Sequence, residues 1–134
     1  MHNNSTIKNQ NLIDKNQLQK IQKKKRLTID PAELQNRYAA GERNFIRADL
    51  SGSNLSGTDL SGSDLKGANL YNANLTNTNL SGTNLSAANL SWTNLTNANL
   101  TNANLSEANL SWARLSWAKL NETNLKGANL IWAT

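Results

Sequence analysis

The residue types that commonly carry catalysis are scarce in this chain. It has no cysteine and a single histidine, His2. Nucleophilic triads and histidine-centred metal sites need such groups held close together, so neither is expected. Residues 52–67 contain glycines spaced five apart, as in a phosphate-binding loop. The segment lacks the Gly-Lys-Ser/Thr sequence that ends such a loop. We therefore predict that the protein is not an enzyme and holds no cofactor or metal.

Tryptophan has the more informative spacing. Trp92, Trp112 and Trp132 are twenty residues apart, and a fourth, Trp117, interrupts the series. Tryptophan is the side chain most enriched at binding hot spots, which favours a docking surface for a protein partner or a second copy. The alternative is that the three indoles stack on one another and only seal one side of the fold. The candidate partner surface consists of Trp92, Trp112, Trp117, Trp132, Arg114 and Lys119.

A five-residue repeat must position these side chains. From Phe45 to Leu130 every fifth residue is an apolar anchor, eighteen in all. The residue directly before an anchor is usually Asn or Asp, and the residue two positions before the anchor is usually small. Anchors five apart would wind around a helix without forming a stripe. In a straight strand they would alternate between faces. Each unit is therefore predicted to be a very short strand followed by a bend, with the anchor and the small residue inside.

Units such as Ala68-Asn69-Leu70 and Ala98-Asn99-Leu100 resemble the signature of the pentapeptide-repeat family. The resemblance implies an all-β fold, a right-handed quadrilateral β-helix with four units per coil. The twenty-residue spacing of the tryptophans agrees with four units per coil and predicts one outward column, with Trp117 around the next corner. On such a coil Asp49, Asp59 and Asp64 fall on three faces, which disfavours a carboxylate metal site. All anchors are expected to be buried.

The chain divides into three parts. Residues 1–29 are rich in Asn, Gln, Lys and Ser, a composition that predicts a disordered basic tail. Residues 30–42 predict a short capping α-helix, because Asp30 and Pro31 are typical of a helix start and Gly41 of a helix end. Residues 43–134 predict the β-helix.

The charge of the chain is unevenly distributed. The formal net charge is +5, but from Arg43 onward six basic residues face five acidic ones. Some pentapeptide-repeat proteins modulate a topoisomerase by imitating DNA, which requires an acidic surface, so the near-neutral rod disfavours that function. The basic run Lys23, Lys24, Lys25 and Arg26 could contact a polyanion, nucleic acid or a membrane surface. We favour a solvated tail, because the run has no interleaved aromatic residues.

The leading hypothesis is a non-catalytic scaffold that presents rigid β-helix faces to an unidentified protein partner. The absence of cysteine, of a membrane-length apolar run and of a secretion signal predicts a cytoplasmic protein. The chain ends in register without a capping pattern, so a homodimer through this end is also predicted. The residues at that end are Leu130, Ile131 and Trp132.

Overall fold

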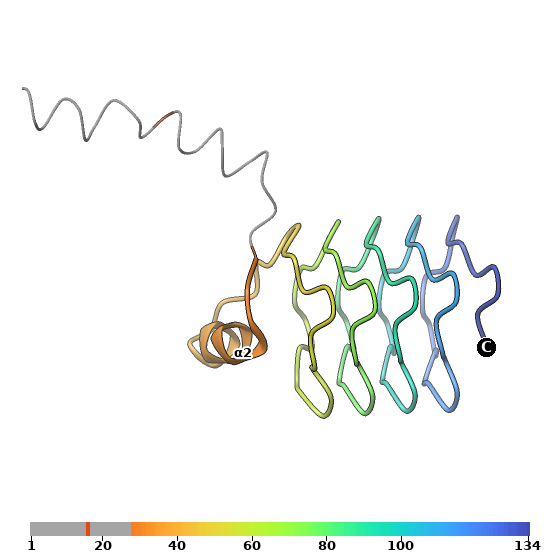
Figure 1. Ribbon diagram of the computed structural model, residues 1–134, viewed down its shortest axis with the longest axis horizontal. Helices are drawn as coiled ribbons and strands as arrows, with labels where there is room; N and C mark the ends of the chain where they lie inside the picture. Colours follow the sequence, from red (N-terminus) through yellow and green to blue (C-terminus); the bar gives the residue numbers. More distant parts are fainter. Residues whose placement is uncertain (1–15, 17–27) are drawn as a thin grey trace, which may run out of the picture.

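The computed structural model describes Asn16 and residues 28–134, and its main body is a stack of four-sided coils (Figure 1). Parallel bridges join residues twenty apart, from Asn44 with Asp64 to Asn109 with Asn129. Four five-residue units therefore make one coil. Within residues 28–134 each side of a coil pairs through a single bridge residue, because the turn of the next corner begins at the anchor that directly follows it. The predicted short strands are thus reduced to one residue each.

Each corner is a four-residue turn that starts at an anchor. At residues 50–53 the Ser53 amide donates to the Leu50 carbonyl at 3.1 Å, and Gly52 has a φ of 67°. A positive φ confined to the third residue defines a type II turn, which favours Gly or Asn at that position. Corner residues with positive φ that are neither Gly nor Asn are Arg47, Ala87, Trp92, Glu107, Trp112, Trp117, Glu122 and Trp132.

The anchors and the small residues fill the interior of the rod. All anchors from Phe45 to Leu110 are at most 3% exposed. The Asn or Asp before each anchor lies outside, and its side chain accepts the backbone N–H two residues later, as Asn69 does from Tyr71 at 3.1 Å. This local bond fixes the start of each corner, which explains why Asn and Asp recur at this position.

One helix covers the first coil. α2 spans Pro31–Ala39, within the range 30–42 expected, and Asp30 caps it by accepting the Glu33 amide at 2.8 Å. Leu34 on this helix is fully buried in the core. The Tyr38 hydroxyl donates to the Ser61 carbonyl at 2.8 Å and so ties the helix to the first coil.

Arg43 departs from the repeat because it stands where the other units have a small inward residue. Its side chain is exposed and turns toward α2, where the guanidinium lies 3.6 Å from the centre of the Tyr38 ring. It also donates to the Tyr38 carbonyl at 2.8 Å. In the first unit Arg43 thus holds the helix, while Phe45 fills the core.

Two expectations about burial were wrong. Thr28 and Ile29, assigned to the tail, belong to the fold: Thr28 bridges to Asp49, and Ile29 is only 2% exposed. An isolated isoleucine gives no periodic signal, so its role at the end of the core was missed. In the last coil Leu120 and Leu130 are 38% and 41% exposed, because they pack against one neighbouring coil instead of two.

Candidate functional site

Three tryptophans form a stack along one corner of the rod. The ring centres of Trp92 and Trp112 are 4.9 Å apart at an interplanar angle of 8°, and those of Trp112 and Trp132 are 5.5 Å apart at 20°. Successive coils place the same corner directly above the previous one, so the single column expected from the twenty-residue spacing is present, and its rings stack on one another as the sealing alternative requires. The three residues are called the Trp wall below.

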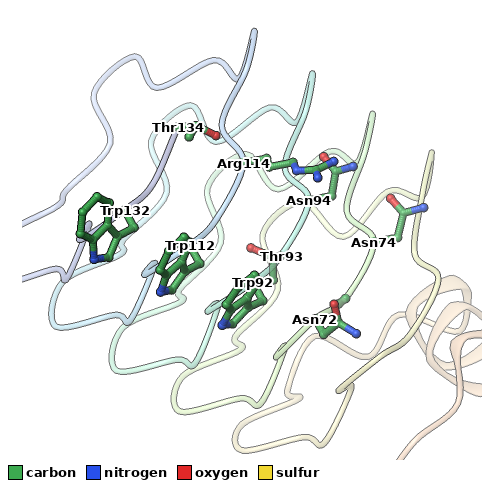
Figure 2. Close-up of a pocket in the computed structure, with 10 residues that line it drawn as sticks. Asn72, Asn74, Trp92, Thr93, Asn94, Trp112, Arg114, Trp132 and Thr134 are labelled. Carbon is green, nitrogen blue, oxygen red and sulfur yellow. The ribbon is translucent and has the colours of Figure 1, made fainter.

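An open groove of about 580 Å³ runs beside the Trp wall. Figure 2 shows the three indoles on one side and Asn74, Asn94 and Arg114 in a second row opposite them. Small residues between the rows, Ala73 and Thr93, are buried and line the groove between them. The two rows come from positions two residues apart, the first at a corner and the second at the bridge position that follows it, and the groove is the space between them.

The second row consists of outward Asn positions, except for its third member. Asn74 and Asn94 bridge to each other, and Asn94 bridges to Arg114. The Oδ1 atom of Asn94 accepts from the Thr96 amide at 3.1 Å and the Thr96 hydroxyl at 2.6 Å. The guanidinium of Arg114 has no acceptor, so the side-chain bond that Asn makes to the backbone N–H two residues later is absent at this corner, and a cation stands in its place.

Trp117 and Lys119 lie apart from this groove. Lys119 bridges to Asn99 on the next face, and Trp117 occupies the corner between the two faces. Trp117 is 87% exposed and makes no ring contact in the described part of the chain. The structure thus brings together four of the six predicted surface residues, Trp92, Trp112, Trp132 and Arg114, and separates the other two. The placement of Trp117 around the next corner from the column is confirmed, and Lys119 lies on the face beyond that corner.

The other predicted contact residues have different outcomes. Leu130, Ile131 and Trp132 are 41%, 62% and 68% exposed at the end of the last coil. His2 and the basic run at residues 23–26 lie outside the described residues. Asn74 and Asn94 were not singled out from the sequence, although both share the twenty-residue register of Arg114. That register was the signal that could have found them.

Candidate catalytic groups do not converge in the described residues. Asp49, Asp59 and Asp64 bridge to three different columns, so the expectation that they lie on separate faces is confirmed. No group of three or more His, Cys, Asp or Glu side chains that could hold a metal is found within residues 28–134. The Ser61 hydroxyl and amide donate to Asp59 and, with the Arg43 charge, hold the pKa of that carboxyl below its usual range.

Among the residues that the structure describes, no helix is both long enough and apolar enough to span a membrane. The stacked coils, the type II corners and the exposed Trp wall define a non-globular repeat protein, a four-sided parallel β-helix with a groove along one face. The pentapeptide-repeat family model matches residues 44–82, 83–121 and 108–134, with eight copies of the repeat. The chain therefore belongs to the pentapeptide-repeat family.

Solved structures of pentapeptide-repeat proteins are similar to this chain. Rfr23 from the cyanobacterium Cyanothece 51142 is 46% identical over 64% of this chain, with a TM-score of 0.64. The chain spans 58% of the length of Rfr23. The protein alr5209 from Nostoc Pcc 7120 is 40% identical, over 78% of this chain and 77% of its own, with a TM-score of 0.47.

HetL, a pentapeptide-repeat protein involved in heterocyst differentiation regulation in Nostoc sp. strain PCC 7120, is 38% identical. The similarity covers 78% of this chain and 46% of HetL, with a TM-score of 0.48. No curated protein matches the chain.

Proposed function

We propose that this protein is a non-catalytic scaffold that binds a protein partner along the Trp wall. The observation that carries the proposal is the presence of three indoles at a corner that two other coils fill with Gly52 and Asn72. The fold does not require bulk at this corner. Tryptophan there adds a large apolar surface to a rod whose outside is otherwise mostly polar.

The backbone conformation strengthens this proposal. Trp92, Trp112 and Trp132 have φ values of 62°, 61° and 61°, a left-handed region that costs residues other than glycine about 1–2 kcal/mol each. Stacking offsets part of that cost, because an aromatic pair contributes about 0.5–1.5 kcal/mol beyond burial. Yet the side chains remain roughly half exposed. A purely structural seal would bury more of each indole for the same strain.

The charge distribution supports a protein partner over imitation of DNA. A DNA mimic needs acidic groups along its outer columns, but in this rod those columns carry mainly Asn amides, with Asp at three positions before the anchors. From residue 43 onward acidic and basic side chains nearly balance. The near-neutral rod therefore favours contact through packing and hydrogen bonds.

The experiment compares partner capture by three full-length proteins: the wild type, Trp112→Asn and Trp117→Asn. Asn suits both corners, because Asn72 and Asn97 occupy the same positions in other coils. A captured protein is identified, purified and titrated against each variant. We expect Trp112→Asn to weaken binding at least about tenfold and Trp117→Asn to leave it unchanged. Equal affinity for wild type and Trp112→Asn at a temperature where both are folded would refute the proposal.

A second candidate function is self-association at the last coil. Leu120, Leu130 and Ile131 expose apolar side chains in that coil, which a second copy could cover in a two-fold contact. Sedimentation at micromolar concentration should then show a dimer for the wild type. Leu130→Asn together with Ile131→Ser should give a monomer, and a wild type that sediments as a monomer would exclude this candidate.

A further inference from the structure

The groove beside the Trp wall has a second side with its own chemistry. Asn74, Asn94 and Arg114 form a row that faces the indoles across the groove (Figure 2). Parallel bridges hold the three residues in consecutive coils, about 4.8 Å apart. This row is called the donor wall below.

Hydrogen bonding inside each corner leaves the donor wall with donors only. The Oδ1 atom of Asn74 accepts the Thr76 amide at 3.1 Å and the Thr76 hydroxyl at 2.7 Å. Asn94 makes the same pair of bonds to Thr96. An amide group has one oxygen and one NH2, so an oxygen held by the corner leaves the NH2 as the group that can still bond to a ligand. The two amides therefore offer N–H groups and no acceptor.

Arg114 adds a positive charge to the donor wall. A guanidinium has five N–H donors and no acceptor, and it binds a carboxylate through two parallel bonds. Within the described residues the side chain of Arg114 makes no hydrogen bond or ion pair. Thr134, the next residue of this column, also lines the groove and adds a hydroxyl. The two amides and the guanidinium together complement a ligand that carries acceptors and negative charge.

The Trp wall determines which apolar groups of a negatively charged ligand can bind beside Arg114. Ring-centre distances of 4.9 and 5.5 Å and small interplanar angles show that the indoles cover one another's faces. A nucleic-acid base stacks on a free aromatic face, and the faces between these rings are occupied. The ring edges remain available, and they suit aliphatic or aromatic side chains. An apolar wall of edges opposite a cationic donor wall fits a peptide better than a single-stranded nucleic acid.

We propose that the groove binds an extended acidic peptide segment of a protein partner. A carboxylate of the segment pairs with Arg114, its other acceptors meet the amides of Asn74 and Asn94, and its apolar side chains pack on the Trp wall. Ala73 and Thr93 between the walls are small enough for a backbone to approach. This inference rests on the proposed function and adds the chemistry of the partner.

The experiment titrates the full chain with two matched peptides, acetyl-Leu-Glu-Leu-Glu-Leu-amide and the same peptide with Gln in place of Glu. Tryptophan fluorescence or calorimetry gives the dissociation constants. Arg114→Asn removes the cation and restores the residue found one coil earlier, so it should not harm the fold. Lys119→Asn makes the same change on the next face and serves as the matched control.

We expect the Glu peptide to bind the wild type at least about tenfold more tightly than the Gln peptide, because a charge-assisted bond to Arg114 is lost with Gln. Arg114→Asn should remove that preference and Lys119→Asn should retain it. The basic tail is present in every variant, so any preference that it contributes is the same in all of them and cancels when the preference of Arg114→Asn is compared with that of the wild type and Lys119→Asn. Oligo-dT, a single-stranded nucleic acid, is titrated in the same way as a competing ligand class. Equal affinity for the two peptides, an unchanged preference in Arg114→Asn, or binding of oligo-dT to the wild type more tightly than the Glu peptide would each overturn the inference.

The same variants separate this inference from the proposed function. If neither peptide binds but Trp112→Asn still abolishes capture of a protein partner, the acidic-peptide inference fails and the scaffold proposal stands. If capture does not depend on Trp112, the scaffold proposal itself fails.

Discussion

The coils from Phe45 to Leu110 and the last coil, residues 115–134, follow the same repeat but differ in how they use it. In the earlier coils every anchor is buried, and each outward position holds Asn or Asp. In the last coil Leu120 and Leu130 are about two-fifths exposed. Its outward positions begin at Lys119, and Arg114 stands just before it.

The difference shows which features the fold requires and which it tolerates. Asn before an anchor closes the corner by a local bond, and neither Arg114 nor Lys119 provides an acceptor for the amide two residues later. Trp117 likewise takes a left-handed φ of 60° without stacking or burial. Three departures within six residues weaken the repeat and add exposed charge and apolar surface. Such departures are where function is to be sought.

The largest predicted effect concerns the anchors. Leu85→Ala should lower the free energy of unfolding by about 2–5 kcal/mol, because it leaves a cavity between two coils. Leu120→Ala should cost well under half as much, since that side chain is already 38% exposed. Chemical denaturation followed by circular dichroism measures both values. Equal losses for the two variants would mean that the last coil is covered in solution.

The tryptophans should give effects of opposite sign. Trp112→Asn loses two ring contacts and a half-buried indole but relieves the left-handed strain, so we expect a net loss of about 2 kcal/mol. Trp117→Asn relieves the same strain and loses no ring contact, so it should stabilise the protein by up to about 1 kcal/mol. Thermal unfolding of the two variants beside the wild type tests this, and a destabilised Trp117→Asn would contradict it.

The outward positions Asn94 and Arg114, which bridge to each other, should also respond differently to substitution. Asn94→Ala removes two hydrogen bonds to Thr96 and should cost about 1–2 kcal/mol. Arg114→Asn restores an acceptor for the amide of Ser116 and should stabilise by about 0.5–1 kcal/mol. The change in the free energy of unfolding for both variants is obtained from the midpoint of denaturant unfolding, provided that the m-value is unchanged. A loss of stability in Arg114→Asn would show that the guanidinium supports the fold.

The smallest effect is a pH dependence at the first coil. The Ser61 hydroxyl donates to Asp59 and lowers the pKa of its carboxyl, so the folded state favours the ionised form. The resulting stability is present above the unfolded pKa, near 3.8, and is lost as the pH falls through the lower folded value. Asp59→Asn should therefore remove part of the decline in melting temperature between about pH 5 and pH 3. An identical decline in both proteins would exclude this contribution.

Much of the fold could be predicted from the sequence because its determinants are local and repeated. A period of five with an apolar anchor allows only a coil with regular bends, and Gly or Asn at the third turn residue specifies the type II corner. Four units per coil, which the family resemblance implied, together with the twenty-residue spacing of Trp92 and Trp112, placed them in one column. Asp30 and Pro31 marked the start of α2 for the same reason, since a helix cap depends on neighbouring residues.

Other features were decided by the tertiary structure alone. Ile29 carries no pattern, and only the open end of the first coil gives it a place in the core. The register assigns Trp112, Arg114 and Trp117 to columns but does not say which columns share a groove. That depends on the corner between Arg114 and Trp117 and on how the stacked indoles are oriented. The free donors of Asn74 and Asn94 likewise follow from hydrogen bonds in the folded corners, because the amide orientation is undefined until the corner has formed.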